Sequence, residues 1–335
     1  MKIQSIHDFY SLFEERLKRE INYNYCLLDI PNHRNIGDLL IWQGELDFLK
    51  KNVNFPCIYT SNLHLFDNKR VGDSIILLHG GGNMGDLWEH HNNYRLEVIK
   101  KFPDNKIIIL PQSMEFHFED KLNRTVEIYE GHPNLMVCAR DKHTYNILTA
   151  LCKKTKVILL PDMAFCSSYS SFNKGSGKLY LKRKDKELNT KIDSSLFADF
   201  DTLDWPTYEY GKVKSFFFHK FQGANKRMSK FLFNYGCLKN HATGLLNVIN
   251  REKLIQVGIE FLSTYNLIVT TRLHGFILAA ILGIPVVIVD NSYGKNKRFY
   301  DTWMKDVPHT YFADNWDEVE RIIEKYRCNQ EIKAC

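Results

Sequence analysis

The sequence predicts an α/β protein made of two domains with parallel sheets. Short apolar strands alternate with helices of about ten to fifteen residues, which is the pattern of βαβ units. The chain has 335 residues, more than the roughly 100–200 residues typical of one domain. A polar stretch of small residues, SSYSSFNKGSG at 167–177, interrupts the alternation and indicates a linker. We therefore expect a first domain over residues 1–170 and a second over 171–335.

The first domain is predicted to begin with an amphipathic helix over its first twenty residues. Five apolar runs, bounded by polar or glycine-rich segments, then have the length and composition of buried strands. The expected strands are Tyr25–Ile30, Ser74–His79, Lys106–Leu110, Leu135–Ala139 and Lys156–Leu160. The expected helices between them are Asp38–Lys51, Leu87–Lys101 and Lys142–Lys153.

The second domain is expected to open with a strand at KLYLK, residues 178–182, directly after the linker. Residues 189–239 are aromatic and basic, and we interpret them as a helical insertion. Regular alternation of strands and helices returns after this region. The predicted elements are a helix at Arg251–Tyr265, a strand at Leu267–Thr270, a helix at His274–Leu282, a strand at Val286–Val289 and a final helix at Asn315–Arg327.

Composition and charge disfavour several classes of protein. The net charge of +6 favours anionic partners in a general way, but it falls short of the dense basic stripe of a nucleic-acid-binding protein. The N-terminal stretch lacks the apolar core of a signal peptide, and no apolar run reaches the roughly 18 residues of a membrane span. The eight cysteines are scattered, without the spacing of a zinc site or a disulfide framework. We expect a cytoplasmic protein that binds no nucleic acid and no metal.

Small and polar residues follow two of the predicted strands of the first domain. Asn35 and Asp38 flank the start of the first long helix, where they either cap that helix or face a ligand. The glycine run at 80–82, followed by Asn83, comes directly after the strand at Ser74–His79. Such a loop lets the backbone approach an anion closely, and the amides of a following helix N-terminus attract one. The alternative interpretation of the glycine run is a tight turn.

Charged segments follow two strands of the second domain. Arg183 lies in the basic run at 182–184, where it either binds a ligand or belongs to a solvated edge. Arg272 and His274 lie at the turn between a buried strand and an apolar helix. An arginine there can bind a carboxylate or a phosphate through two hydrogen bonds, and the histidine can donate to an anion or transfer a proton. The alternative is a helix-capping histidine beside a surface arginine, which the apolar context disfavours.

Seven segments, in their order and spacing, resemble the polysaccharide pyruvyl transferase family. They are NIGD (35–38), LLHGGGN (77–83), ILPQS (109–113), CARD (138–141), LLPDMAF (159–165), TTRLHG (270–275) and VVIVDNSYGK (286–295). The resemblance implies two Rossmann-like domains that face a cleft, as in GT-B glycosyltransferases. It also implies transfer of the enolpyruvyl unit of phosphoenolpyruvate to two hydroxyls of one sugar, with release of phosphate. Phosphoenolpyruvate is then a co-substrate, and no cofactor or metal is expected.

The resemblance assigns donor binding to the second domain. It implies that Arg272 and Arg183 hold the carboxylate and the phosphate of the donor, with Lys182 or Lys184 as alternatives to Arg183. His274 is expected to contact the phosphate or to transfer a proton. The sugar is expected to lie against the first domain. The predicted catalytic residues are His274, Arg272 and Asp38, and the predicted substrate-binding residues are Arg183, Lys295, Tyr293, Ser292, Asn35, Gly81, Gly82, Asn83 and His79.

Two other functions fit the same fold. A glycosyltransferase would bind a nucleotide-sugar in the cleft, whereas a non-catalytic protein would bind carbohydrate and release no phosphate. The acceptor sugar is expected in a polysaccharide or in a lipid-linked oligosaccharide precursor. For a lipid-linked acceptor, the basic and aromatic stretch Lys212–Lys230 is expected either to contact the inner surface of the membrane or to form a packed insertion.

Overall fold

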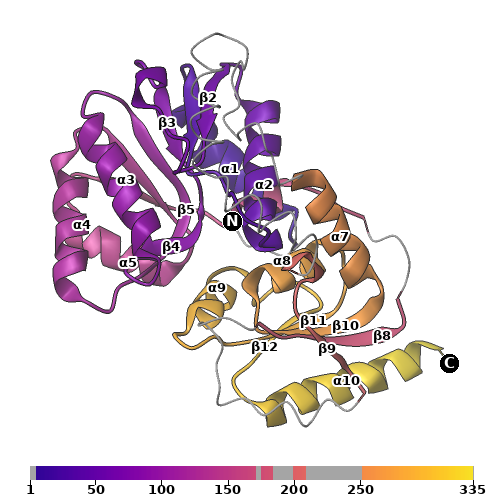
Figure 1. Ribbon diagram of the computed structural model, residues 1–335. Coiled ribbons are helices and arrows are strands. Elements are labelled where there is room, and N and C mark those ends of the chain that lie inside the picture. Colours follow the sequence, from indigo (N-terminus) through magenta and orange to yellow (C-terminus); the bar gives the residue numbers. More distant parts are fainter. Residues whose placement is uncertain (1–4, 171–174, 184–198, 209–250, 335) are drawn as a thin grey trace.

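The computed structural model describes residues 5–170, 175–183, 199–208 and 251–334, with side chains described up to residue 326. Its strands form two sheets, which lie beside each other with helices packed against their faces (Figure 1). All the strand pairs in these ranges are parallel. The predicted α/β class with parallel sheets is therefore confirmed.

The first sheet has the strand order β2-β1-β3-β5-β6-β7, with β4 paired to β5. Its strands are β1 (Tyr25–Leu28), β2 (Cys57–Ser61), β3 (Ile75–Leu78), β4 (Gly81–Gly85), β5 (Ile107–Glu115), β6 (Leu135–Ala139) and β7 (Lys156–Leu159). The helices are α1 (Asp8–Arg16), α2 (Ile36–Asn52), α3 (Glu89–Lys101), α4 (Glu119–Gly131) and α5 (Lys142–Leu151). Every residue of β1, β3 and β6 is buried, as expected when helices cover both faces of a parallel sheet.

The second sheet has the strand order β12-β11-β10-β8-β9. Its strands are β8 (Gly177–Leu181), β9 (Asp201–Leu203), β10 (Tyr265–Thr270), β11 (Val286–Val289) and β12 (Thr310–Ala313). The helices are α7 (Arg251–Ser263), α8 (Leu273–Ile281), α9 (Lys295–Trp303) and α10 (Trp316–Ala334). The four residues of β11 are β-branched and buried, which explains why the sequence predicts this strand at its observed boundaries.

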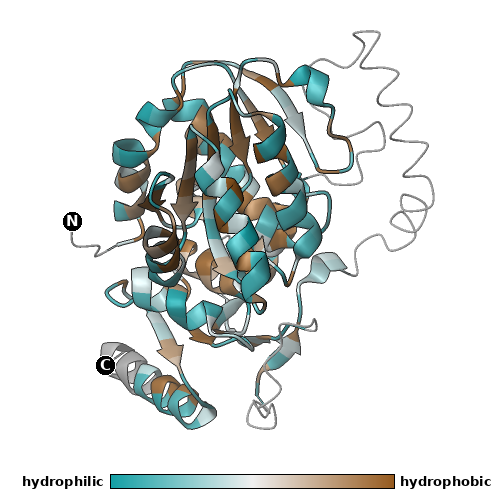
Figure 2. Cartoon of the chain, turned by 90° about the vertical axis from the view of Figure 1, so that its left-hand side faces the viewer, coloured by the Kyte–Doolittle hydropathy of each residue, from teal (hydrophilic) through white to brown (hydrophobic). Residues whose placement is uncertain are grey.

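One hydrophobic core extends through both sheets. It includes Leu77 of β3 and Ile108 of β5 on one side, and Ile268 of β10 and Ile288 of β11 on the other. Helix α2 joins the two halves because it contacts both α7 and α8. Figure 2 shows hydrophobic strands in the interior and largely hydrophilic outer helices. The two sheets are therefore packed against each other rather than connected only by the chain between them.

The main difference from the sequence prediction concerns the glycine-rich segment. We expected a glycine-rich loop before a helix, either approaching an anion or forming a tight turn, but residues 81–85 form strand β4, which pairs with the end of β5. Gly85 has a φ of +141°, and a Cβ there would lie 1.8 Å from the carbonyl oxygen of Glu115. Because β4 needs a partner, β5 runs on to Glu115 instead of ending at Leu110, and α3 begins at Glu89 rather than Leu87.

Other elements were absent from the prediction or fall outside the described residues. The sequence did not predict β2, β12, α4 or α9, and α1 is shorter than the predicted twenty residues. The predicted insertion at 189–239 is described only over 199–208, which hold β9 and the turn η4 (Pro206–Tyr208). The stretch Lys212–Lys230 lies outside the described residues, and the domain boundary at residue 170 stays a prediction. Within the described part of the chain, no helix has the length and apolar character needed to cross a membrane.

Candidate active site

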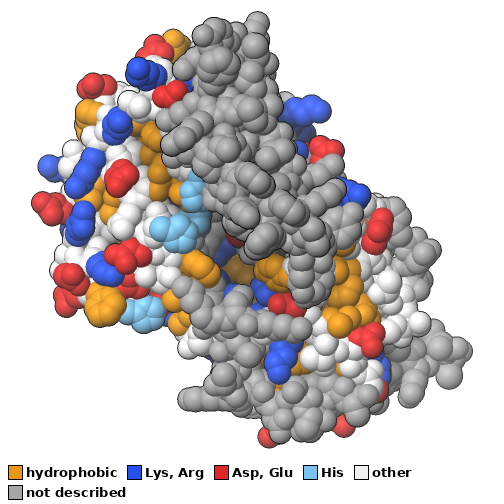
Figure 3. Space-filling view, viewed as in Figure 1, with side chains coloured by type: hydrophobic (Ala, Val, Ile, Leu, Met, Phe, Trp, Pro, Cys, Tyr) orange, Lys and Arg blue, Asp and Glu red, His pale blue; other side chains and the backbone are white. Residues whose placement is uncertain are grey.

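The carboxyl ends of β6, β7 and β10 bring charged residues from both sheets together. Arg140 follows β6, Asp162 follows β7, and Arg272 and His274 follow β10. Loops at this edge of parallel sheets commonly bind ligands. His274, in the first turn of α8, packs against Gly37 at the start of α2, where a Cβ would lie 2.6 Å from its Nδ1. Where grey atoms do not cover the boundary between the two halves in Figure 3, a few basic side chains are visible together with hydrophobic and acidic ones.

Asp162 joins His274 to Arg140. Its Oδ2 accepts a hydrogen bond from Arg140 Nη1 at 2.8 Å and lies 3.2 Å from His274 Nε2. Asp162 and Arg140 are both almost completely buried. Burial alone would raise the pKa of Asp162, but His274 and Arg140 hold it well below its usual range. The carboxylate is therefore ionised between two positively charged or proton-donating groups.

Arg140 has a second terminal nitrogen that Asp162 does not use. Its Nε donates to Ser113 Oγ at 2.9 Å, whereas Nη2 is buried without a hydrogen-bond partner among the described residues. A Cβ on Gly82 would lie 2.8 Å from this Nη2 and 3.3 Å from Lys295 Nζ. Gly82 therefore leaves space beside two cationic groups, one from each half of the molecule. Its neighbour Gly81 is buried and has a φ of +133°, a conformation that favours glycine.

Lys295 is held by the loop that precedes α9. Its backbone N–H donates to Asn291 Oδ1 at 2.9 Å, and Gly294 has a φ of +84°. The Lys295 ammonium lies 5.4 Å from the centre of the Tyr293 ring. Ser292 is exposed in the same loop. The structure thus places Lys295 and Tyr293 together near Gly82, with Ser292 at the solvent-facing part of the loop.

Arg272 and Arg183 are buried, so the surface alternatives for both residues are wrong. Their exposed fractions are 6% and 7%. Asp204 binds Arg272 through two hydrogen bonds, to Nε at 2.5 Å and to Nη2 at 2.7 Å, and the Tyr208 ring lies 5.3 Å from the guanidinium. Arg183 is close enough for its charge to act on Arg272, and its backbone N–H donates to Thr271 Oγ1 at 3.1 Å. Donor binding by Arg272 would require it to share or release Asp204, and this role stays a prediction.

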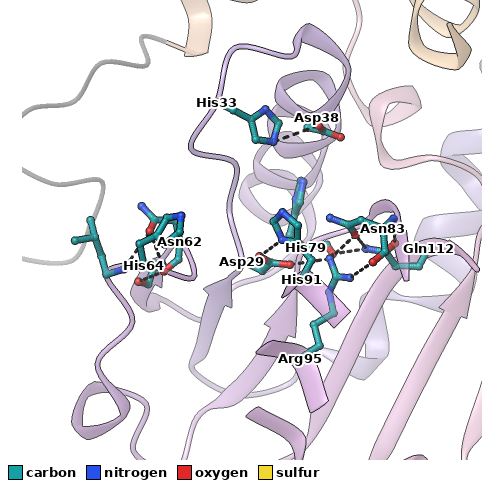
Figure 4. Close-up of polar contacts among 12 residues, drawn as sticks. Asp29, His33, Asp38, Asn62, His64, His79, Asn83, His91, Arg95 and Gln112 are labelled. Carbon is teal, nitrogen blue, oxygen red and sulfur yellow. Dashed lines mark hydrogen bonds and ion pairs between the residues drawn. The ribbon is translucent and has the colours of Figure 1, made fainter. Parts of the chain in front are cut away.

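Asp38 and Asn35 lie at the N-terminus of α2. Asn35 Oδ1 accepts from a backbone N–H of the first turn at 3.2 Å, so Asn35 caps the helix, and its Nδ2 donates to Asp38 Oδ2 at 2.8 Å. His33 Nε2 lies 3.4 Å from Asp38 (Figure 4). Burial would raise the pKa of Asp38, but the charges of His33, His274 and His79 bring it below its ordinary value. The Asp38 carboxylate is 28% exposed and can accept hydrogen bonds from hydroxyl groups.

His79 lies beneath this surface. Its Nδ1 pairs with Glu45 Oε2 at 2.8 Å, and Glu45 Oε1 accepts from the backbone N–H of Gly80 at 2.8 Å. Burial would lower the pKa of His79, but the Glu45 carboxylate raises it above its ordinary value. The ring is 3% exposed, so its predicted contact with substrate would require the ring to become accessible and stays a prediction.

Asn83 is used to hold the glycine-rich strand in place. Its Oδ1 accepts from Arg95 Nη2 at 2.7 Å and from Gln112 Nε2 at 3.1 Å. Arg95 pairs with Asp29 at 2.7 Å, and Asp29 also lies 3.0 Å from His91 Nδ1 (Figure 4). This network fixes the position of β4, and through it the gap at residue 82.

The residues that the sequence did not predict include Arg140, Asp162, Asp204 and Glu45, and the first two carried a usable signal. Arg140 and Asp162 come just after predicted strands, as Arg272 does, but Arg140 is followed by the further charges Asp141 and Lys142, and Asp162 is a single charge in an apolar segment. Asp204 and Glu45 carried no local signal. Asp204 is 68 residues from its partner Arg272 in the sequence, and Glu45 is 34 residues from its partner His79. In the described ranges, no group of histidine, cysteine, aspartate and glutamate residues could hold a metal ion.

Comparison with known proteins identifies the family. The family model described as polysaccharide pyruvyl transferase matches residues 35–293, which is most of the chain. The chain belongs to the polysaccharide pyruvyl transferase family. This confirms the resemblance expected from the seven sequence segments.

Two curated proteins and one solved structure are similar to this chain. "Putative pyruvyl transferase EpsO" of Bacillus subtilis is 30% identical over 302 residues, covering 88% of this chain and 89% of that protein. "Pyruvyl transferase 1" of Schizosaccharomyces pombe is 26% identical over 295 residues, covering 83% and 69%. The crystal structure of KP1_0663, an uncharacterized protein from Klebsiella pneumoniae, has a TM-score of 0.57 at 21% identity, covering 91% of this chain and 98% of that one. The last likeness concerns the fold alone.

Proposed function

We propose that this polysaccharide pyruvyl transferase moves pyruvate from phosphoenolpyruvate to two hydroxyls of one sugar, forming a cyclic ketal and releasing phosphate. The family and the names of its relatives support pyruvyl transfer as the reaction class. The donor and the acceptor are argued from the site. In this proposal, the two halves of the molecule are Rossmann-like domains that face a cleft in a GT-B-like arrangement.

The donor site is proposed at the gap beside Gly82. A buried guanidinium N–H without an acceptor is unfavourable, and Arg140 Nη2 is such a group among the described residues. An anion placed at the missing Cβ of Gly82 would contact both Nη2 and Lys295 Nζ. Phosphoenolpyruvate carries a carboxylate and a phosphate close together, and so needs several fixed positive groups. The unpartnered Arg140 Nη2 beside Lys295 is the observation that carries the proposal.

The proton balance of the reaction gives His274 a role. The two acceptor hydroxyls lose two protons, of which one ends on the methylene carbon of the donor and the other leaves with the phosphate. A single histidine can therefore take a proton from a hydroxyl and deliver it to the donor. His274 suits this role because its ring lies between Asp162 and the start of α2. The proposed reaction uses no metal and no cofactor.

The acceptor is proposed to lie against α2 in the first half of the molecule. Asp38 is an ionised, partly exposed carboxylate, and together with Asn35 it can orient sugar hydroxyls. We propose as acceptor a sugar of a polysaccharide or of a lipid-linked oligosaccharide precursor. The proposed place is the cytoplasm or the cytoplasmic face of the membrane. The described thiols Cys26, Cys57, Cys138, Cys152 and Cys166 are free, which is typical of a reducing compartment.

Thermal stability with different ligands tests the donor. Phosphoenolpyruvate should raise the melting temperature of the native protein, whereas uridine and guanosine diphosphates should not. The shift should be lost in Lys295→Met and in Arg140→Lys, which keeps the charge next to Asp162 but lacks the second terminal nitrogen. Arg124→Met, on the exposed face of α4, is the matched control and should keep the shift.

The other outcomes of this experiment would indicate a different function or a different donor site. A shift with a nucleotide diphosphate alone would indicate a nucleotide-sugar glycosyltransferase. Binding of saccharides without phosphate release from phosphoenolpyruvate would indicate a non-catalytic carbohydrate-binding protein. A phosphoenolpyruvate shift that Arg140→Lys and Lys295→Met both retain would place the donor elsewhere, for example at Arg272.

A further inference from the structure

Asp162 is held in one orientation from several directions. It follows β7 and caps the short turn η3 (Met163–Cys166), where Oδ1 accepts from the backbone N–H of Ala164 at 2.9 Å. Its other oxygen, Oδ2, accepts from Arg140 Nη1 at 2.8 Å and lies 3.2 Å from His274 Nε2. The side chain is 1% exposed. The carboxylate therefore cannot turn away from His274 without losing two other hydrogen bonds.

This arrangement decides which ring nitrogen of His274 carries the proton. An ionised carboxylate can only accept hydrogen bonds, so the atom facing it, Nε2, must donate. The positive groups around Asp162 keep its pKa well below the ordinary value, and the carboxylate is thus ionised throughout the neutral range. The other ring nitrogen, Nδ1, lies over the first turn of α2, 2.6 Å from where a Cβ on Gly37 would be, and the charge of His274 is near enough to lower the pKa of Asp38.

We propose that Asp162 is a positioning residue that keeps the proton of the neutral His274 ring on Nε2, leaving Nδ1 to move protons between acceptor and donor. This inference rests on the proposed function. Aspartate–histidine pairs fix the tautomer and the orientation of catalytic histidines in serine proteases in the same way. Here the aspartate comes from the first half of the molecule and the histidine from the second. The catalytic ring is therefore correctly oriented only when both halves are in place.

The proton transfers balance with Nδ1 as the carrier. In the first addition, the O–H bond of one hydroxyl breaks, and its proton passes through Nδ1 to the methylene carbon of phosphoenolpyruvate. That carbon becomes a methyl group, and the hydroxyl oxygen bonds to the neighbouring carbon. In the second addition, the other hydroxyl oxygen bonds to the same carbon while the carbon–oxygen bond to phosphate breaks, and its proton leaves with the phosphate. His274 ends in its starting protonation state, and no oxidant or reductant is needed.

The tautomer can be measured directly by NMR on the whole protein with labelled histidine. The His274 signals are identified by their loss in His274→Gln. At a pH where the ring is neutral, the native protein should show a protonated Nε2 and an unprotonated Nδ1. Asparagine would not test this, because an amide oxygen bound to Arg140 Nη1 would still face Nε2. In Asp162→Ala, no oxygen faces Nε2, so the ring should lose its fixed tautomer and carry its proton on Nδ1 in part of the molecules. A native ring protonated on Nδ1 would overturn the proposal.

Turnover separates positioning from a structural role. Asp162→Ala should lower kcat by about 10²–10⁴-fold, the range of general acid–base catalysis, while the melting-temperature shift with phosphoenolpyruvate is retained. The control is Asp141→Asn. Asp141 is 2% exposed and caps α5 through Thr144, a task that asparagine also performs, so kcat should stay within about twofold. An unchanged kcat in Asp162→Ala would contradict the proposal.

The two proposals fail in different ways. If Asp162→Ala does not fold, the tautomer of the native ring still decides the question, because its measurement needs no variant at position 162. If phosphoenolpyruvate neither binds nor turns over, the proposed function is wrong, whereas the position of the proton on His274 remains measurable. A single Nε2–H tautomer that persists unchanged in folded Asp162→Ala would show that Asp162 does not control it.

Discussion

Gly82 matters to the proposed donor site because of the side chain that it lacks. In Gly82→Ala, the methyl group would lie 2.8 Å from Arg140 Nη2 and 3.3 Å from Lys295 Nζ, where the anion is expected. We expect KM for phosphoenolpyruvate to rise about tenfold, equivalent to about 1.4 kcal/mol of binding free energy. The backbone at this position is outside the left-handed region, so the fold should persist. Initial rates of phosphate release at varied donor concentration measure the effect.

The control for this change is Gly131→Ala at the end of α4. A Cβ there would meet no atom within 4 Å, and in Figure 1 α4 lies away from α9, the helix that begins at Lys295. Gly131→Ala should therefore leave KM for the donor unchanged. If Gly82→Ala also leaves it unchanged, the anion does not bind beside this glycine.

At the level of single residues, the sequence predicted positions better than partners. His274 and Lys295 could be found because each lies shortly after a predicted buried strand, at the edge of a parallel sheet where loops commonly bind ligands. The binding of Arg272 by Asp204 could not, because the two are 68 residues apart and lie on different loops. Ser113 and Asp162 accept from two nitrogens of Arg140, and Nη2 has no partner among the described residues. Which nitrogens find an acceptor depends on packing, so only the structure reveals it.

At the level of elements, apolar runs in the sequence predicted the central strands correctly. They did not predict a strand whose pairing depends on close approach of the backbone. The buried strands β6 and β11 have the predicted boundaries because every one of their residues is apolar. Strand β4 consists mostly of glycine and has no apolar pattern, and it exists because Gly85 can approach the carbonyl of Glu115. The same contact extends β5 through a proline, Pro111, which local signals would place at a strand end.

Helix α4 and the loop before β7 are joined by one carboxylate, and this contact should depend on pH. Glu130 accepts from the backbone N–H groups of Lys153, Lys154 and Thr155 at 2.9–3.1 Å. Burial opposes ionisation, but these hydrogen bonds outweigh it and lower the pKa of Glu130 to about 2. Because the folded pKa lies below the unfolded value of about 4.3, the contribution to stability is complete above pH ~4.3 and is lost as the pH falls toward 2.

We therefore expect Glu130→Gln to lower the free energy of unfolding by about 1 kcal/mol at pH 7, a value modest because the site is partly solvated. The difference from the native protein should shrink as the pH is lowered below about 4.3. Urea unfolding at a series of pH values measures it. Glu127→Gln, exposed on the same helix, should match the native protein at every pH. A Glu130→Gln difference that stays constant down to pH 3 would contradict the role of the charge.

At the scale of the whole molecule, the sequence indicated where regular structure stops but not how tightly the two halves pack. The predicted linker indicated two domains. In the structure both sheets share a core, and α2 of the first half packs so closely on α8 of the second that a Cβ on Gly37 would lie 2.6 Å from His274 Nδ1. Contacts across the halves come from residues far apart in the chain. Arg298 pairs with Glu115 at 2.6 Å, across 183 residues, and no local pattern can anticipate such a pair.

This shared core predicts that the molecule unfolds as one cooperative unit. Calorimetry should show one transition whose calorimetric and van't Hoff enthalpies agree, and tryptophan fluorescence should change together with the far-ultraviolet circular dichroism. Arg298→Met removes the pair with Glu115, and because that pair is only partly exposed, the single transition should move down by about 1–3 °C without splitting. Lys305→Met breaks the more exposed pair with Asp301 and should not move it measurably. Two resolved transitions in the native protein would instead mean that each sheet is stable alone, and that the packing between them, which brings Asp162 to His274, contributes little to the stability of either half.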